Sequence, residues 1–427
     1  MKLWNKGYLT EQIVDQFTVG NDRQLDLNLV AYDLLASKAH AKMLYACGLL
    51  STTEKTAIIN GLNQIEQEVE QGNFTIEKDF EDVHSKIEYA LIQYIGEAGK
   101  KIHTARSRND QVLVALHLYI KAELTKIQID LTNLFDTLIT LSEAHKDVLI
   151  PGYTHMQVAM PSSFGLWFGA YAETLIDDLT FCKAAHTIAN QNPLGSAAGY
   201  GTSFPIDRNI TTQELGFAHL KYNVVAAQMS RGKLEKSAAF ALSSIGGTLA
   251  KLASDICLYM SQNFNFVQFP KELTTGSSIM PHKQNPDVFE LVRAKSNKIQ
   301  NLPAEIILLT NNLTSGYHRD FQLLKESLMD AINTTKENLK ISRFMLENIQ
   351  VNPAAIQDEK YNYIYSVEAV NKLVMAGVPF REAYQEIGHQ IMHNKYKPLK
   401  EVYHTHQGSI GNLCNAEIKE KMAKLLA

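Results

Sequence analysis

Residues 112–146 read VLVALHLYIKAELTKIQIDLTNLFDTLITLSEAHK, and this stretch determines the predicted fold. Apolar side chains recur in it at steps of three and four residues: Leu113, Leu116, Ile120, Leu124, Ile127, Leu131, Leu134, Leu138 and Leu141. That spacing predicts the buried face of one continuous helix, on the order of 50 Å long at a rise of about 1.5 Å per residue. A helix of this length packs lengthwise against other helices at small crossing angles, as in a bundle. We expect it to end before Pro151.

The rest of the chain continues the helical pattern. Long helices are predicted over residues 233–263 and from Asp287 onward, and there is no strand-like alternation of any length. We therefore predict an all-α fold with a central bundle of very long helices at 105–352, between smaller helical domains at 1–104 and 353–427. The apolar seams of such a bundle need partner subunits, so a homo-oligomer is expected.

Composition and charge exclude several classes of function. The 427 residues carry a net charge of −4 with no long basic stretch, so no nucleic-acid partner is expected. There is no apolar run of about eighteen residues that would predict a membrane span. Residues 1–6, MKLWNK, show no apolar signal-peptide core. The four cysteines are scattered and form no metal-ligand pattern, so a cytoplasmic protein without a metal site is predicted.

Residues 274–286, TTGSSIMPHKQNP, form a constrained loop, hereafter the signature loop. Its prolines forbid a continuous helix, and Gly276 followed by two serines allows a sharp turn that presents hydroxyl and backbone N–H groups together. Ile279 and Met280 are apolar, so we expect them to be buried and to hold the hydroxyls near a core. Lys283 adds a positive charge. This combination of residues predicts a loop that binds an anion and supplies a candidate nucleophile or base. The alternative is a polar connection between helices.

Other polar stretches lie near predicted helix ends. Residues 103–110, HTARSRND, place two arginines beside a helix N-terminus, which suits a carboxylate. The alternative is capping by Asn109 or Asp110 together with a surface ion pair. Residues 150–157, IPGYTHMQ, present an adjacent Thr-His pair after a turn-forming Pro-Gly. His84 follows Glu81 and Asp82, which indicates either an acid–base pair or acidic residues that complement a helix dipole.

Several motifs resemble those of known enzymes. GSSIMPHKQNPD at 276–287 is similar to the loop of the fumarase/aspartase superfamily, whose members eliminate fumarate from succinyl compounds. HTARSRNDQV at 103–112, GYTH at 152–155 and the 317–325 segment resemble motifs of the argininosuccinate lyase family, and so does the 377–383 run. The resemblance extends over nearly the whole chain.

This resemblance implies a fumarase/aspartase-like fold and the reversible β-elimination of argininosuccinate to arginine and fumarate, the last step of arginine biosynthesis. It also implies a homotetramer with active sites shared between subunits, and no metal or organic cofactor. Two alternatives stay open. One is a lyase of the same branch that releases fumarate from a different succinyl-amine substrate, and the other is a catalytically inactive, crystallin-like structural protein.

The resemblance also implies roles for individual residues. Ser277 matches the catalytic base, and Lys283 matches the cation that stabilises its alkoxide. His155 matches the donor of a proton to the departing guanidine, oriented by Glu290. Such cations and donors are needed because the reaction forms a doubly charged aci-carboxylate. The matched substrate-binding positions are Thr154, Ser107, Arg108, Asn109, His84, Asn285, Tyr317, Gln322, Lys325 and Arg231.

The chain departs from the family pattern at several positions. These are Gly20, where the family has a substrate-binding serine, together with Met160, His282, Gln284, Leu323, Leu324 and the segment Met229–Lys233. The proton-transfer and fumarate-binding residues are retained, and the changes fall where the arginine end of the substrate would bind. The departures therefore bear on the identity of the substrate more than on the type of reaction. The retained Ser277, Lys283 and His155 argue against a purely structural role.

Overall fold

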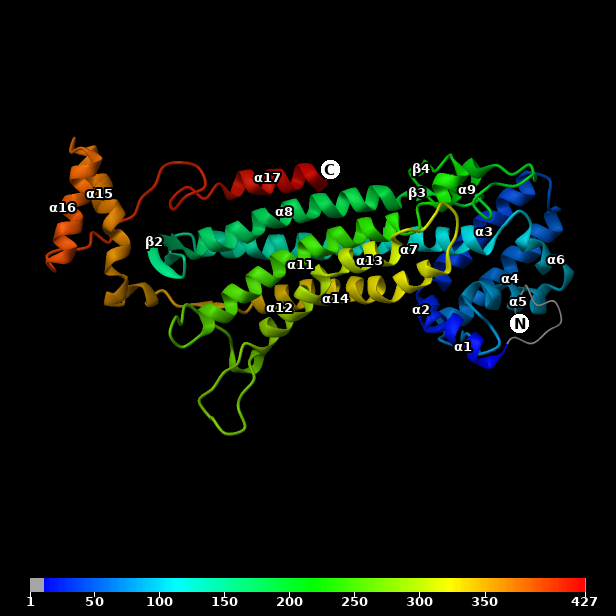
Figure 1. Ribbon diagram of the computed structural model, residues 1–427, viewed down its shortest axis with the longest axis horizontal. Helices are drawn as coiled ribbons and strands as arrows, with labels where there is room; N and C mark the ends of the chain where they lie inside the picture. Colours follow the sequence, from blue (N-terminus) through cyan, green and yellow to red (C-terminus); the bar gives the residue numbers. More distant parts are fainter. Residues whose placement is uncertain (1–10, 427) are drawn as a thin grey trace. The chain divides into compact units, whose positions relative to one another are not determined.

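A computed structural model describes the chain from residue 11 to residue 426 (Figure 1). Helices dominate it, so the predicted all-α fold is confirmed. The long helices are α7 (Arg108–Ala144), α8 (Phe164–Ala189), α11 (Lys233–Met260) and α14 (Leu324–Leu346). Between residues 11 and 426 no helix has both the length and the apolar character needed to cross a membrane. Residues 1–6, on which the absence of a signal peptide was predicted, lie outside the described range.

Helix α7 confirms the apolar spacing from which it was predicted. Every seam residue from Leu113 to Leu138 is at most 1% exposed, and Leu141 is partly buried. Full burial of one such side chain stabilises the fold by about 1.5–3 kcal/mol, so this face supplies most of the helix's packing energy. The helix ends at Ala144, ahead of Pro151 as expected.

Contacts between Cα atoms divide the chain into two compact units. Unit 1 comprises Met1–Gln128, Phe181–Ser243 and Ile299–Thr334, and unit 2 comprises Ile129–Thr180, Ser244–Lys298 and Thr335–Ala427. Several long helices contribute residues to both units. The predicted division at 1–104, 105–352 and 353–427 rests on a different criterion and stays a prediction.

Unit 1 contains the N-terminal helices and the segments that pack with them. Its elements are α1 (Gln12–Val19), α2 (Asp22–Leu25), α3 (Val30–Ala46), α4 (Thr52–Glu70), α5 (Val83–Ile95), α6 (Glu97–Lys100), β3 (Gln191–Asn192), α9 (Arg208–Glu214), β4 (His219–Leu220), α10 (Val224–Gln228), α13 (Leu302–Thr310) and the 3₁₀ turn η4 (Arg319–Leu323). Leu34, Leu44 and Ile58 are fully buried in the core that α3, α4 and α5 share. Gly61 allows close approach there, because a Cβ atom would lie 2.6 Å from Leu91 Cδ1.

A β-hairpin in unit 2 was not predicted. Strands β1 (Leu149–Thr154) and β2 (Gln157–Ser163) pair antiparallel, so the expectation of no strands was wrong at this place. The pairing of Thr154 with Gln157 leaves His155 and Met156 as the two residues of the turn. Both have positive φ angles, 51° and 60°, as two-residue hairpin turns require. Neither is a glycine, so the hairpin holds His155 in an unfavourable backbone conformation.

The remaining elements of unit 2 form a small C-terminal helical group and short strands. They are β5 (Val267–Gln268), α12 (Asp287–Gln300, which runs on into unit 1), β6 (Gln350–Val351), α15 (Ser366–Met375), α16 (Phe380–Met392) and α17 (Asn415–Leu426). Helices α15 and α16 lie side by side (Figure 1) and bury Val370, Ala383 and Ile387 between them. The signature loop extends away from the start of α12 (Figure 1).

Candidate active site

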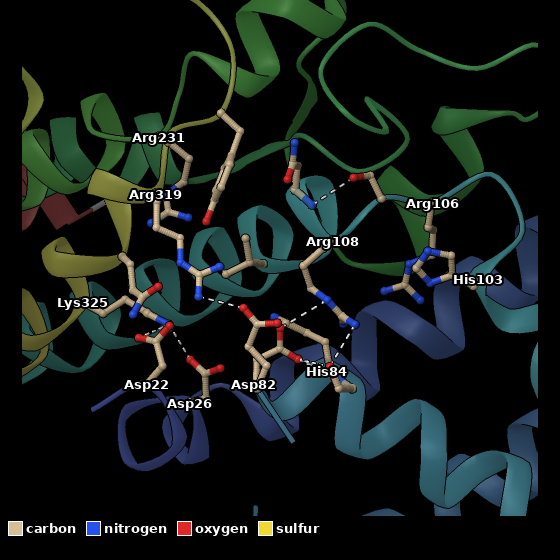
Figure 2. Close-up of a pocket in the computed structure, with 17 residues that line it drawn as sticks. Asp22, Asp26, Asp82, His84, His103, Arg106, Arg108, Arg231, Arg319 and Lys325 are labelled. Carbon is tan, nitrogen blue, oxygen red and sulfur yellow. Dashed lines mark hydrogen bonds and ion pairs between the residues drawn. The ribbon is translucent and has the colours of Figure 1, made fainter. Parts of the chain in front are cut away.

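A pocket of about 490 Å³ lies within unit 1 (Figure 2). Its lining is strongly charged and comes from segments far apart in the sequence. The lining residues are Asp22, Asp26, Glu81, Asp82, His84, Ser85, His103, Arg106, Ser107, Arg108, Asn109, Val112, Arg231, Tyr317, Arg319, Gln322 and Lys325. The pocket thus brings together the predicted substrate-binding residues Ser107, Arg108, Asn109, His84, Arg231, Tyr317, Gln322 and Lys325. The predicted residues Thr154, His155, Ser277, Lys283, Asn285 and Glu290 belong to unit 2.

The start of α7 forms one wall of the pocket. Ser107 caps the helix: its Oγ accepts a hydrogen bond from Asn109 N at 3.2 Å, and its own N–H donates to Asp110 Oδ1 at 2.9 Å. The other carboxylate oxygen of Asp110 accepts from the backbone of Gly195 and Ala197. The residue that caps the helix is therefore Ser107 and not Asn109 or Asp110, although Asp110 completes the cap by accepting from the N–H of Ser107. This cap also fixes the helix N-terminus toward the pocket, where free N–H groups and the helix dipole favour an anion.

Arg108 is held on this wall by side chains at the start of α5. Its Nε lies 3.3 Å from Asp82 Oδ2, and its Nη2 donates to Ser85 Oγ at 3.2 Å. Asp82 in turn caps α5 through Ser85 N. Burial would raise the pKa of Asp82, but Arg108 and His84 hold it below its ordinary value. The guanidinium is therefore oriented before any ligand binds.

His84 lies beneath the pocket and has a different partner from the one suggested by the sequence. Its Nδ1 is 2.9 Å from Asp33 Oδ2, and the two side chains are at most 1% exposed. The neighbouring Glu81 instead accepts from Arg319, and Asp82 pairs with Arg108. Of the two interpretations of the acidic residues before His84, the acid–base pair is wrong, because the carboxylate that reaches the ring comes from α3. The interpretation as acidic residues at a helix start is confirmed, since Asp82 caps α5.

Lys325 occupies the opposite end of the pocket between two carboxylates (Figure 2). Its Nζ lies 2.8 Å from Asp22 Oδ1 and 2.7 Å from Asp26 Oδ1. Burial would lower the pKa of Lys325, but Asp26 and Asp22 raise it above its ordinary value. Burial raises the pKa of Asp22 to about 6, although Lys325 acts in the opposite direction. Asp22 therefore titrates near neutral pH.

Three further predicted substrate-binding residues line the pocket: Arg231, just before α11, and Tyr317 and Gln322 in the 317–325 segment. Arg231 and Gln322 also make hydrogen bonds within the chain. Arg231 is 4% exposed, with Nε 2.9 Å from Glu235 Oε1 and Nη2 donating to Phe321 O at 2.7 Å. Gln322 Nε2 donates to the backbone oxygens of Thr18 and Val19. These bonds hold the segment over the pocket. Tyr317 is about one-third exposed and lines the pocket.

Several lining residues were not predicted from the sequence. Asp22, Asp26 and Arg319 line the pocket directly, and Asp33 lies behind His84. Arg319 lies in the 317–325 segment that resembles a family motif, so the sequence could have indicated it as a site residue. The three aspartates were detectable only as acidic residues in the stretch at 21–33, NDRQLDLNLVAYD, which mixes polar and apolar residues. A buried acidic residue in such a stretch needs a partner, which is the available signal.

The signature loop in unit 2 is held by its own backbone. Thr275 and Asn285 form an isolated bridge, and Asn285 Nδ2 donates to Gly276 O at 3.0 Å. Ser277 Oγ accepts from the N–H groups of Met280 at 3.2 Å and Ile279 at 3.4 Å. Two backbone donors on one hydroxyl oxygen favour negative charge at that atom.

The expected burial of Ile279 and Met280 is wrong for this chain: Ile279 is 83% exposed and Met280 is 37% exposed. The loop extends away from the helices of its own unit, so there is no intrachain core for these side chains to enter (Figure 1). Lys283 is exposed as well. The loop therefore presents its functional groups outward.

The hairpin presents Thr154 and His155 at its exposed end, while its base is anchored. Tyr153 donates its hydroxyl to Tyr361 at 3.3 Å and packs against Phe264. Glu290, at the start of α12, is exposed. In the described part of unit 2, no hydrogen bond or ion pair joins His155 to Glu290, so the predicted orientation of His155 by Glu290 stays a prediction. Among residues 11–426 no group of three or more His, Cys, Asp or Glu is placed to hold a metal ion.

Comparison with known proteins identifies the family. The sequence profile of a lyase family matches residues 6–301. Argininosuccinate lyase of Phocaeicola vulgatus is 53% identical over 425 residues, covering 100% of this chain and 95% of that protein. The chain belongs to the argininosuccinate lyase family. Argininosuccinate lyase of Thermotoga neapolitana is 42% identical over 386 residues, with 90% of this chain and 97% of that protein covered.

A solved structure agrees with the fold expected for this family. A variant of EDDS lyase with bound fumarate superimposes with a TM-score of 0.80, at 21% identity, over 96% of this chain and 90% of that one. The fumarase/aspartase-like fold is therefore confirmed, and the argininosuccinate lyase family member described here is an enzyme of the carbon–nitrogen lyase class.

Proposed function

We propose that this chain eliminates fumarate from argininosuccinate and releases arginine, as the last step of arginine biosynthesis. The observation that carries the proposal is the pocket at the start of α7. Ser107, Arg108 and Asn109 surround a capped helix N-terminus there, which suits a dicarboxylate such as the succinyl end of the substrate. The family membership supports the same reaction.

The signature loop supplies the proposed base. Ser277 Oγ removes the proton from the carbon beside a substrate carboxylate, and the bond between the neighbouring carbon and the guanidine nitrogen then breaks. Two backbone N–H groups already point at this oxygen, and Lys283 adds a positive charge to the loop, which together support an alkoxide. His155 donates a proton to the departing guanidine nitrogen with Glu290 orienting its ring. Asn285 and Thr154 bind carboxylate oxygens of the substrate.

The same proposal includes a cytoplasmic homotetramer with shared active sites. Several large apolar side chains of the bundle helices are exposed in the single chain: Phe181, Phe240, Leu291 and Leu308 are 48–72% exposed. The signature loop also exposes apolar side chains, which a partner subunit would bury. All four cysteines are free thiols, as a reducing compartment requires. Light scattering is expected to give a mass near four times 47.9 kDa.

The test is the release of fumarate from argininosuccinate, followed by its ultraviolet absorbance. The wild type should produce fumarate, and Ser277→Ala should lower the rate by about 10²–10⁴-fold, the usual contribution of a positioned base. Ser278→Ala is the matched control, because it removes the neighbouring hydroxyl of the same loop and should retain most of the activity. Equal rates in the two variants would remove Ser277 from its proposed role.

A second candidate is the release of fumarate from a different succinyl amine. It is favoured by the departures at the end of the pocket beside Lys325. Leu323 and Leu324 stand there where the family has acidic residues, and Leu323 is 59% exposed. The retained Gln322 beside them donates to the backbone oxygens of Thr18 and Val19. A folded wild type that gives fumarate from another succinyl amine, and none from argininosuccinate, would favour this candidate.

A further inference from the structure

A buried cluster of polar side chains lies directly beneath the pocket of unit 1. It consists of Asp33 and Ser37 on α3, His84 on α5 and Arg106 just before α7, and we refer to it as the Asp33 cluster. The side chains of Asp33, His84 and Arg106 are at most 1% exposed, and Ser37 is 1% exposed. His84 and Arg106 also line the pocket (Figure 2), so the cluster connects the buried helix α3 to the ligand-binding wall.

Asp33 is the centre of this cluster. Its Oδ2 is 2.9 Å from His84 Nδ1, and its Oδ1 is 3.4 Å from Arg106 Nη2. Ser37 Oγ accepts from Arg106 Nη1 at 3.0 Å and donates to Asp33 Oδ1 at 3.4 Å. Burial would raise the pKa of Asp33, but His84 and Arg106 lower it to about 2. The carboxylate is therefore charged at neutral pH and holds one nitrogen of each neighbour.

Each of these neighbours keeps one buried nitrogen without a partner. Among the described residues, His84 Nε2 and Arg106 Nε have no hydrogen-bond partner although both atoms are buried. An unpaired buried polar atom destabilises the fold and marks a place where a ligand or water can complete the bond. Both residues line the same pocket, so a ligand bound in it is the available partner.

We propose that Asp33 is a positioning residue for substrate binding: it fixes the ring of His84 through Nδ1, so that Nε2–H donates a hydrogen bond to a carboxylate of the succinyl substrate. The inference rests on the proposed function for the identity of that substrate. Asp33 itself does not line the pocket, so its effect on the ligand passes through His84. When both ring nitrogens carry protons, both are hydrogen-bond donors, and Asp33 then accepts from Nδ1 while Nε2 faces the ligand.

A purely structural reading of the cluster predicts something different. Under that reading, Asp33 only ties α3, α5 and the start of α7 together, and its loss lowers stability without a specific effect on ligand affinity. Under the positioning reading, the loss of Asp33 weakens ligand binding, and this effect depends on the presence of His84. A double-mutant cycle separates the two readings, because it measures whether one residue acts through the other.

The experiment uses full-length Asp33→Asn, His84→Gln and the double variant, with kcat and KM for argininosuccinate and the inhibition constant for fumarate as readouts. Asp33→Asn is isosteric and is expected to raise KM and the fumarate constant by about tenfold, the loss that accompanies one misplaced charged hydrogen bond, with a smaller change in kcat. In the His84→Gln background, Asp33→Asn should raise KM and the fumarate inhibition constant by less than about twofold. Equal factors in both backgrounds, or a loss of stability with an unchanged KM, would overturn the proposal.

Asp178→Asn is the matched control. Asp178 is 2% exposed, accepts a hydrogen bond from Ser244 and does not line the pocket, so its replacement tests the general effect of neutralising a buried aspartate. It should leave KM and the fumarate constant unchanged. If the wild type binds fumarate but does not act on argininosuccinate, the proposed function fails while the positioning of His84 is still tested by fumarate affinity.

A measurement on the wild type keeps the proposal testable if Asp33→Asn does not fold. Nitrogen NMR of protein labelled at its histidines, with His84 assigned by His84→Gln, reports which ring nitrogens carry protons. We expect a proton on Nδ1 in the free enzyme and protons on both nitrogens when fumarate is bound. A free Nδ1, or a ring that does not respond to fumarate, would contradict the role given to Asp33.

Discussion

The pocket of unit 1 and the signature loop of unit 2 carry charged groups in opposite ways. In the pocket, Lys325 is 4% exposed and lies between Asp22 and Asp26, both of which contact its ammonium. In the signature loop, Lys283 is exposed, and Ser277 is held only by backbone N–H groups. The charged groups of the pocket are thus paired with one another, whereas the charged side chain of the signature loop is exposed to solvent.

This difference separates the side chains that hold the pocket in place from the side chains that are available for catalysis. Paired, buried charges fix the geometry of the binding wall before a ligand arrives, and the loss of one partner leaves the other as an uncompensated buried charge. An exposed loop contributes little to stability, so its residues are free to be chosen for chemistry. Substitutions in the loop should therefore change rates, and substitutions in the network should change stability first. The following predictions test this comparison.

The largest effect on rate among the following predictions is expected for Lys283→Met in the signature loop. Removing a cation that stabilises the developing negative charge should lower kcat by about 10²–10³-fold. The free energy of unfolding should stay within about 0.5 kcal/mol of the wild type, because the side chain is exposed. Fumarate release and urea unfolding measure the two quantities on the same sample. A large fall in stability would show that the loop is part of the folded network after all.

Lys325→Met should give the reverse result in the pocket. It leaves Asp22 and Asp26 buried without their shared cation, so the free energy of unfolding at pH 7 should fall by about 3–5 kcal/mol. Lys325 lowers the pKa of Asp22 in the wild type, where it is about 6, so in the variant Asp22 takes up its proton at a higher pH and the variant gains more stability than the wild type as the pH falls. The deficit relative to the wild type should shrink between pH 7 and pH 5. Urea unfolding at both pH values checks this, and a constant deficit would contradict it.

The two regions also differ in how far the sequence predicted them. The burial of α7 followed from a local period, because an apolar residue every three or four positions needs no knowledge of distant parts of the chain. The burial of Ile279 and Met280 was inferred from their apolar character alone and was wrong, since the loop has no core of its own to enter. The residues of a loop can indicate its function, but they do not show whether another part of the structure buries its apolar side chains.

The site was predicted best where one motif carries the residues. Ser107, Arg108 and Asn109 are neighbours in sequence and line one wall of the pocket. The pairing of Asp33 with His84 joins residues 51 positions apart on different helices, and no local pattern selects one aspartate of α3 over another polar residue. The hairpin that holds His155 was missed because Pro151 and Gly152 interrupt the alternation that would indicate a strand.

A smaller effect is expected when Asp22 is neutralised. Asp22→Asn removes a negative charge from a pocket proposed to bind an anion, so the inhibition constant for fumarate at pH 7 should fall by about threefold. In the wild type the same gain should appear as the pH falls through about 6, where Asp22 takes up a proton. Asp22→Asn should lack this step. The measurement is the ratio of the two inhibition constants from pH 5 to pH 8, because other titrating groups then cancel. A constant ratio would contradict the role of Asp22.

The smallest effect is expected at Ala105, which leads into the network through Arg106. Ala105 has a φ angle of 61°, a conformation that costs an L-residue about 1–2 kcal/mol and glycine almost nothing. Ala105→Gly should raise the free energy of unfolding by about 0.5 kcal/mol, because relief of strain exceeds the added freedom of the unfolded chain.

Ala98→Gly in α6 is the matched control for Ala105→Gly, because this residue lies in a short helix of the same unit. It should lower stability by about 0.5–1 kcal/mol. KM should be unchanged in Ala105→Gly, since Asp33 and Ser37 hold the guanidinium of Arg106 independently of the backbone at Ala105. Urea unfolding and fumarate release test both parts. A rise in KM would mean that the strained backbone, and not only the buried network, sets the position of Arg106 at the edge of the pocket.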